Sequence, residues 1–178
     1  MTHKNTRGLV QIFTGSGKGK TTAALGTVIR AAGHNLKISV IFFIKGRSSQ
    51  GEYKTLAALP NVKVASFGLR QFIHKESGVN PAEKAQAQAA LAAARQDVAS
   101  GDFDLVVLDE VNIAVHFHLL EVDEVLQLIK DKPPHVELIL TGRGADEKLI
   151  EIADLVTEMV KIKHPFDKGI KARKGIEY

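Results

Sequence analysis

The stretch Thr14-Gly-Ser-Gly-Lys-Gly-Lys-Thr-Thr22 lies between the apolar run Leu9 to Phe13 and a segment with helical spacing that begins at Thr21. A glycine-rich turn between a strand and a helix can direct its backbone N–H groups at phosphate oxygens, and the helix dipole adds positive potential there. Lys20 supplies a full positive charge, and Thr21 supplies a hydroxyl that suits Mg²⁺. The stretch therefore predicts a phosphate-binding loop and a chain that binds a nucleotide.

This loop departs from the usual pattern G-x-x-x-x-G-K-[ST] at its first position. Counting back from Gly19-Lys20-Thr21 places Thr14 where the first glycine normally stands, and the glycine follows at Gly15. The residues expected to contact the nucleotide are Gly15, Ser16, Gly17, Lys18, Gly19, Lys20, Thr21 and Thr22. For Lys18 the sequence leaves two interpretations open, because an exposed loop lysine is as often solvated as directed at a phosphate.

Apolar runs alternate with amphipathic segments along the chain, which predicts an α/β fold with a mainly parallel central sheet between helices, the three-layer fold of RecA-like P-loop NTPases. The expected strands are Leu9–Phe13, Lys37–Ile44, Val62–Phe67, Asp104–Asp109, His135–Leu140 and Leu155–Ile162. The expected helices run from Thr21 to a left-handed Gly33, from Asn80 to Gly101, over Glu121–Lys132 and over Asp146–Ala153. We expect one domain over residues 1–178, with a flexible N-terminus at 1–7 and a basic C-terminal tail at 163–178.

The predicted strand Asp104–Asp109 leads into two acids, Asp109 and Glu110. Mg²⁺ bound to phosphates prefers a few hard oxygen ligands, and Mn²⁺ accepts the same kind, so either acid can join Thr21 as a metal ligand. Because ligands of parallel α/β sheets bind at the carboxyl ends of strands, the acids and the loop are expected to face each other. Arg143 follows a glycine at another strand end, where a phosphate clamp and a structural ion pair are both open interpretations.

Composition excludes several other kinds of site. The 178 residues contain no cysteine, which rules out disulfides, thiolate metal sites and a cysteine nucleophile, and fits the cytoplasm. Apolar runs are too short to span a membrane, and the net charge of +4 is concentrated in the tail, so neither a membrane nor a nucleic acid is the expected partner. His116 and His118 face apart at a spacing of two, and His164 is more typical of a structural histidine than of a base.

Together these residues resemble the P-loop type of ATP:corrinoid adenosyltransferases. The resemblance covers residues 8–178 and is carried by four internal segments and the ending: the loop Phe13–Ala23, the segment Phe43–Gly46, the acidic strand end Val106–Asn112, the turn Thr141–Gly144 and the last residues Lys163–Tyr178. The displaced first glycine is a feature of that family. The resemblance implies transfer of the 5′-deoxyadenosyl group of ATP to a cobalt(I) corrinoid with release of triphosphate, and a nucleotide that lies reversed in the loop.

The resemblance also implies roles for residues and partners. Lys20, Thr21 and Glu110 are expected to be catalytic, with Thr21, Glu110 and Asp109 on the metal and Arg143 on the nucleotide. An apolar or aromatic side chain is expected over the lower face of the corrinoid, and Phe67 and Phe72 are the candidates in this chain, which lacks the tryptophan of some relatives. A homodimer and a flavin-dependent electron donor are expected as well. The alternative enzyme is an ATP hydrolase or kinase on the same fold, with the two acids as metal ligand and base. The alternative that is not an enzyme is a nucleic-acid-binding module that uses the basic tail.

Overall fold

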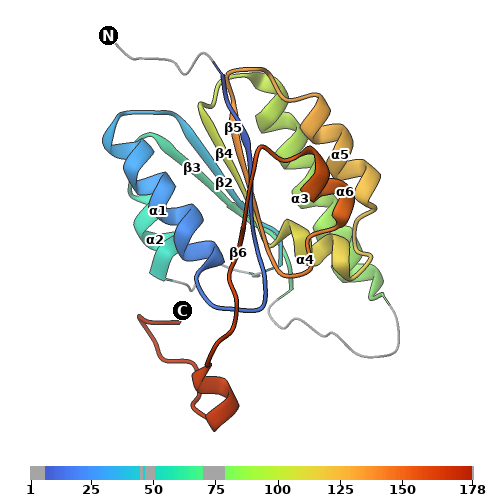
Figure 1. Cartoon of the computed structure of the whole chain (residues 1–178). Coiled ribbons are helices and arrows are strands. Elements are labelled where there is room, and N and C mark those ends of the chain that lie inside the picture. The colour runs from blue at the N-terminus through green and yellow to red at the C-terminus, as the bar shows by residue number, and fades with distance from the viewer. Residues whose placement is uncertain (1–6, 45, 47–50, 70–78, 178) are drawn as a thin grey trace.

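The computed structural model describes residues 7–44, 46, 51–69 and 79–177 and contains one parallel sheet (Figure 1). Its strands are β1 Val10–Thr14, β2 Ile38–Phe42, β3 Val62–Ser66, β4 Leu105–Asp109, β5 Glu137–Thr141 and β6 Leu155–Glu158. They lie in the order β3-β2-β4-β5-β1-β6, and all neighbouring pairs run parallel. The parallel arrangement brings every carboxyl end to one edge of the sheet, so β1 and β4 end on the same side with β5 between them.

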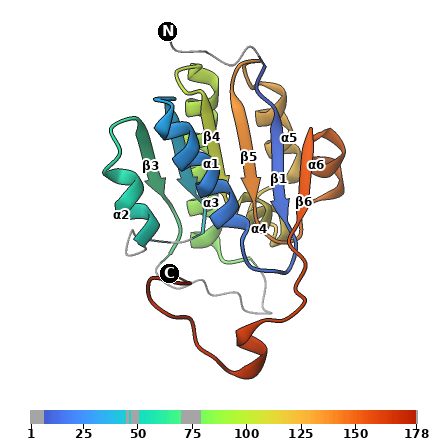
Figure 2. The same cartoon turned by 60° about the vertical axis from the view of Figure 1, so that its left-hand side comes forward.

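Helices cover both faces of this sheet (Figures 1 and 2). They are α1 Lys20–Gly33, α2 Gly51–Ala57, α3 Pro81–Ser100, α4 Val111–His116, α5 Val122–Lys130 and α6 Glu147–Ile152, and a 3₁₀ turn, η1, spans Pro165–Lys168. Helices α1 and α2 lie on one face, and α3 to α6 lie on the other. The predicted three-layer α/β fold with a parallel sheet is confirmed, although the short helices α2 and α4 were not foreseen.

Alternation along the strands separates two hydrophobic clusters, because successive side chains of a strand point to opposite faces. In β1, Ile12 packs with α3 to α6, whereas Phe13 packs with α1 and α2. The strands β2, β4 and β5 have apolar residues on both faces, which explains why the sequence shows them as continuous apolar runs rather than as alternating patterns. The edge strand β6 differs, since all four of its residues are exposed.

Two helix ends follow the sequence signals, and one does not. The side chain of Asn80 accepts a hydrogen bond from the Ala82 N–H at 2.9 Å, and Gly101 ends α3 in the left-handed conformation with φ of 66°. The expectation of a left-handed Gly33 is wrong. Gly33 stays inside α1, and the left-handed turn comes two residues later at Asn35, with φ of 59°, because asparagine tolerates this conformation better than other non-glycine residues.

The last strand is also shorter than predicted, and its partner explains why. Within the part of the chain that the structure describes, β6 pairs only with β1, and the pairing ends where Thr14 lies opposite Glu158, since β1 turns there into the loop. Past Glu158 the chain passes beneath the carboxyl edge of the sheet into η1 and the tail (Figure 1). Within the described ranges no helix is long and apolar enough to cross a membrane. Residues 1–6 of the expected flexible N-terminus lie outside the described residues.

Candidate active site

A pocket of about 580 Å³ opens at the carboxyl edge of the sheet, between α1 and the tail. Its floor is the loop from Ser16 to Thr22, and its walls include Glu52, Glu110, Arg143, His164 and Glu177. Cavities of a few hundred to a thousand cubic ångströms are the usual size of small-ligand sites. The pocket therefore lies where ligands bind in parallel α/β folds and is large enough for a nucleotide.

The phosphate-binding loop packs against the chain segment that follows β6. This contact explains why the glycine stands at position 15 and not at position 14. The Met159 N–H donates to the Thr14 carbonyl at 2.8 Å, and the Gly17 N–H donates to the Met159 carbonyl at 2.6 Å. Gly15 has φ of 95°, and a Cβ there would lie 2.6 Å from the same carbonyl oxygen. Thr14, where the usual pattern has glycine, is buried and accepts a hydrogen bond from the Ala145 N–H at 3.3 Å. The glycine is needed one position later because the close approach occurs there.

Lys20 reaches back across the loop. Its Nζ donates to the carbonyl oxygens of Gly15 at 2.9 Å and Gly17 at 2.7 Å, and the residue as a whole is 8% exposed. Burial lowers the pKa of Lys20 below its ordinary value, while the nearby carboxylate of Glu110 acts in the opposite direction and the guanidinium of Arg143 adds to the lowering. The structure thus brings Lys20, Glu110 and Arg143 within electrostatic reach of one another, although they come from three separate segments.

The two acids after β4 differ in position. Asp109 is fully buried, and its Oδ1 accepts a hydrogen bond from the Thr141 hydroxyl at 2.7 Å. The same hydroxyl accepts the Glu110 N–H at 3.0 Å, so Thr141 connects the two acids. Glu110 has φ of 64° and lines the pocket, whereas Asp109 lies behind it. Of the two acids, Glu110 is the one in position to meet a ligand directly.

The turn after β5 places Arg143 at the pocket wall. It lies between Gly142 and Gly144, which have φ of 132° and 62°. A Cβ on Gly142 would come within 2.9 Å of the Ile113 nitrogen, and one on Gly144 within 2.7 Å of Nδ1 of His116. Close packing of both glycines on α4 therefore fixes the backbone on each side of Arg143, while its own side chain is exposed and, among the described residues, forms no ion pair.

Comparison with known proteins identifies the family. The profile of the family described as "ATP:corrinoid adenosyltransferase BtuR/CobO/CobP" matches residues 6–178. The chain belongs to the ATP:corrinoid adenosyltransferase family. Corrinoid adenosyltransferase activity, in the synthesis or salvage of cobalamin, follows from that membership.

Three related proteins align with almost the whole length of this adenosyltransferase. A corrinoid adenosyltransferase of Pseudomonas aeruginosa is 42% identical over 98% of this chain and 86% of its own length. Corrinoid adenosyltransferases of Escherichia coli K12 and Salmonella typhimurium, the latter named CobA, are 37% and 38% identical over 97% of this chain and 86% of their own lengths.

The site residues predicted for this adenosyltransferase fall into three groups. The residues from Ser16 to Thr22, together with Glu110 and Arg143, line the pocket. Gly15 and Asp109 do not line it, but the Gly15 carbonyl accepts a hydrogen bond from Nζ of Lys20, and Asp109 accepts one from the Thr141 hydroxyl. Phe67 packs against the core on the side of α3 and does not line the pocket, and Phe72 lies outside the described residues. The roles of all these residues stay predictions.

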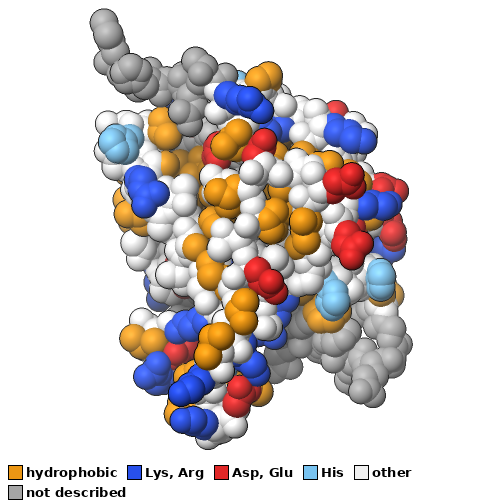
Figure 3. Space-filling view, in the orientation of Figure 1, with side chains coloured by type: hydrophobic (Ala, Val, Ile, Leu, Met, Phe, Trp, Pro, Cys, Tyr) orange, Lys and Arg blue, Asp and Glu red, His pale blue; other side chains and the backbone are white. Residues whose placement is uncertain are grey.

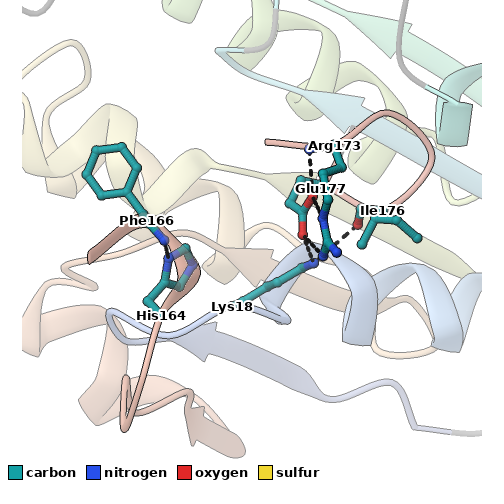
Figure 4. Close-up of polar contacts among 6 residues, drawn as sticks. All are labelled: Lys18, His164, Phe166, Arg173, Ile176 and Glu177. Atoms are coloured by element: carbon teal, nitrogen blue, oxygen red, sulfur yellow. Dashed lines mark hydrogen bonds and ion pairs between the residues drawn. The ribbon is translucent and has the colours of Figure 1, made fainter. Parts of the chain in front are cut away.

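Sequence reasoning missed several residues that line the pocket. The tail contributes His164, Ile176 and Glu177, and α2 contributes Glu52. His164 accepts the Phe166 N–H on its Nδ1 at 3.2 Å and so starts η1 (Figure 4). The ending of the chain was one carrier of the family resemblance, which is the one signal that pointed to the tail. Nothing in the local sequence of α2 marks Glu52.

Proposed function

We propose that the pocket binds ATP with its triphosphate in the loop and transfers the 5′-deoxyadenosyl group to the cobalt(I) of a corrinoid. The observation that carries this proposal is the position of Lys20, whose ammonium is held at the centre of the loop by the Gly15 and Gly17 carbonyls. Phosphate oxygens entering there meet this charge, the loop N–H groups and the N-terminus of α1, a helix of 14 residues.

The reaction needs little proton transfer. The electron pair of cobalt(I) attacks C5′ of ATP, a cobalt–carbon bond forms, and the C5′–O bond breaks with its electrons leaving on the triphosphate. The protein therefore has to hold the nucleotide in line with the cobalt and stabilise negative charge on the leaving group. Lys20, the loop and Arg143 supply positive charge and N–H donors on that side, which fits a leaving triphosphate.

We further propose that Thr21 and Glu110 hold Mg²⁺ on the triphosphate. Both are oxygen donors that line the pocket, the ligand type that Mg²⁺ and Mn²⁺ prefer. Bound there, the ion would neutralise part of the charge on the leaving triphosphate. Asp109 takes part through Thr141, which holds the Glu110 backbone in place.

Product analysis of Lys20→Ala tests the proposal. The assay is anaerobic and contains ATP, Mg²⁺ and chemically reduced cobalamin, with adenosylcobalamin followed by absorbance and triphosphate by chromatography. We expect at least a hundredfold loss in kcat/KM for Lys20→Ala, the order found when a charge-stabilising donor is removed. Lys130→Ala, at an exposed position of α5, is the matched control and should retain full activity. ADP formed at the same rate with or without corrinoid would favour the hydrolase or kinase instead.

An aromatic side chain under the corrinoid is also proposed, with Phe72 and Phe67 as the candidates. Removal of the lower axial ligand of cobalt(II) eases its reduction and changes its electron paramagnetic resonance spectrum. We expect Phe72→Ala to reduce the fraction of four-coordinate cobalt(II) formed with ATP bound. Phe67→Ala should change it less, because the half-buried Phe67 packs against the core next to β3. The reverse result would assign the role to Phe67.

We propose that a second copy of the chain covers the β6 edge. Figure 3 shows hydrophobic side chains gathered on this face, over β6. Leu155 and Val156 of the strand are 41% and 40% exposed, and Ile162 beyond it is 82% exposed. An exposed edge strand with apolar side chains readily pairs with another chain unless something covers it. Ile162→Lys should shift the sedimentation coefficient from dimer to monomer, and an unchanged monomeric value in both proteins would contradict the proposal.

Reduction of the corrinoid cobalt to cobalt(I) needs an electron, and the chain has no cysteine pair that could supply it. We propose a flavin-dependent donor, because reduced flavins deliver single electrons. A reduced flavoprotein replacing the chemical reductant in the same assay should support turnover in proportion to its concentration.

A further inference from the structure

The C-terminal tail brings Arg173 to the same carboxylate, that of Glu177, which Lys18 of the nucleotide pocket contacts. Lys18 extends from the loop, and its Nζ contacts the Glu177 Oε1 at 3.0 Å and the Ile176 carbonyl at 3.2 Å (Figure 4). The guanidinium of Arg173 contacts the same Oε1 through Nη2 at 2.9 Å. Two cations from opposite ends of the chain thus meet at a single carboxylate oxygen.

The carboxylate of Glu177 is held as a phosphate group would be. Its other oxygen, Oε2, accepts the Arg173 backbone N–H at 2.7 Å and the Nε–H at 3.2 Å. Backbone N–H groups, a guanidinium fork and a lysine are the donors that proteins use for phosphate oxygens. The hydrogen bonds from Arg173, followed by that from Lys18, lower the pKa of Glu177 to about 2, so the group in this position is an anion at neutral pH.

The position of this cluster relates it to the nucleotide. Both Lys18 and Glu177 line the pocket whose floor is the phosphate-binding loop, and Lys18 is two residues from Lys20. A triphosphate in the loop would bring several negative charges close to the Glu177 carboxylate. Like charges at such short range disfavour each other, and a phosphate carries more charge and more acceptor oxygens than a carboxylate. A phosphate is therefore the stronger ligand for the two cations.

We propose that Arg173 and Lys18 form an anion subsite for a phosphate of the ATP triphosphate, and that Glu177 competes with that phosphate for them. This inference rests on the proposed nucleotide site. Binding of ATP transfers Lys18 and Arg173 from the carboxylate to the phosphate, which draws the tail over the pocket. Return of Glu177 to the two cations then helps to displace the triphosphate product.

Binding of inorganic triphosphate, measured by isothermal titration calorimetry at fixed salt and Mg²⁺, tests the subsite. Arg173→Gln should weaken binding about tenfold, the effect of losing a hydrogen bond to a charged group at a partly exposed site. Glu177→Gln, which keeps the shape but removes the competing charge, should strengthen binding about tenfold. In the double variant Arg173→Gln/Glu177→Gln, the gain in affinity for triphosphate should disappear. Adenosine, which has no phosphate, should bind the wild-type protein and the three variants equally.

Two results would overturn the subsite. Weaker triphosphate binding by Glu177→Gln would mean that the carboxylate supports the pocket wall and does not compete. Unchanged binding by Arg173→Gln would remove Arg173 from the site. Lys20→Ala separates this failure from that of the function itself. If Lys20→Ala loses triphosphate binding while the tail variants do not change it, the nucleotide pocket stands and only the subsite is lost. If Lys20→Ala binds normally, the pocket assignment is lost.

Discussion

Substituting Gly15 by alanine should destabilise the protein more than the same change at the other loop glycines. Gly15 combines a φ of 95° with a Cβ position only 2.6 Å from the Met159 carbonyl oxygen. The backbone conformation alone costs a non-glycine residue about 1–3 kcal/mol, and the forced shift of a packed backbone adds about 1–3 kcal/mol. We therefore expect Gly15→Ala to lower the free energy of unfolding by about 2–6 kcal/mol, a large part of the roughly 5–15 kcal/mol typical of a domain.

Other glycines of the chain serve as controls that separate the cost of the backbone conformation from the cost of crowding at the Cβ position. Gly19 has φ of 121° with its nearest neighbour at 3.6 Å, so Gly19→Ala tests the conformation alone and should cost about 1–3 kcal/mol. Gly17 has ordinary φ but a Cβ position 2.7 Å from the Met159 oxygen, so Gly17→Ala tests the crowding alone and should cost about 1–3 kcal/mol. Gly26 lies inside α1 with open space around it, and Gly26→Ala should stabilise by about 0.5–1 kcal/mol.

Urea unfolding followed by circular dichroism measures all four differences. The reasoning is refuted if Gly15→Ala loses no more stability than Gly19→Ala, because the contact with the segment after β6 would then exert no constraint. If Gly15→Ala lowered the slope of the unfolding free energy against urea concentration without changing the midpoint, the substitution would act on the unfolded chain instead.

Three further predictions concern polar groups. Thr141→Val removes the hydroxyl that connects the two acids after β4, so it should cost about 1–3 kcal/mol in urea unfolding and raise the Mg²⁺ concentration needed for half-maximal activity. Asp97→Ala should cost about 3 kcal/mol, because the buried Asp97 accepts from the Ser39 hydroxyl at 2.7 Å and from Nζ of Lys63 at 2.6 Å; a cost below about 1 kcal/mol would contradict this. The pKa of Glu177, measured by carbon NMR, should be about 2, against 4.5 for an ordinary glutamate. The contact of Glu177 with Arg173 and Lys18 should therefore be complete above pH 4.5 and lost as the pH falls towards 2. A titration midpoint of Glu177 near 4.5 would show that this contact does not form in solution.

The fold was predictable where the sequence signal is local. A parallel strand buried on both faces is apolar along nearly its whole length, which is why the predicted ends of β2, β4 and β5 lie within two residues of the observed ends. The length of β6 depends on where its partner β1 ends, and that information lies over a hundred positions away in the chain. The helices α2 and α4 span 7 and 6 residues, too few for a periodic pattern to emerge.

The same division holds for the pocket. Its floor is a contiguous motif, so the residues from Ser16 to Thr22 could be placed there from the sequence. Lys18 and Glu177 are 159 positions apart, and their contact depends on the path of the whole tail beneath the sheet. No spacing rule connects such residues. Local spacing also left the choice between Asp109 and Glu110 open, because it depends on the direction in which the backbone turns after β4. Only the family resemblance favoured Glu110.

That turn is the most informative strained position in the described part of the site. Glu110 adopts φ of 64°, a left-handed conformation that costs a side chain such as glutamate about 1–2 kcal/mol. A glycine or an asparagine would relieve this strain, but neither provides a carboxylate. The strain is held by the Thr141 hydroxyl, which accepts the Glu110 N–H and donates to the buried Asp109. A strained residue kept in place by a buried network points to a need for its side chain, and here that side chain lines the pocket beside Lys20. We therefore propose that Asp109 acts on the metal site indirectly, because its hydrogen bond to Thr141 helps to hold the Glu110 backbone. On this proposal a buried acid of the pair can still matter to the chemistry.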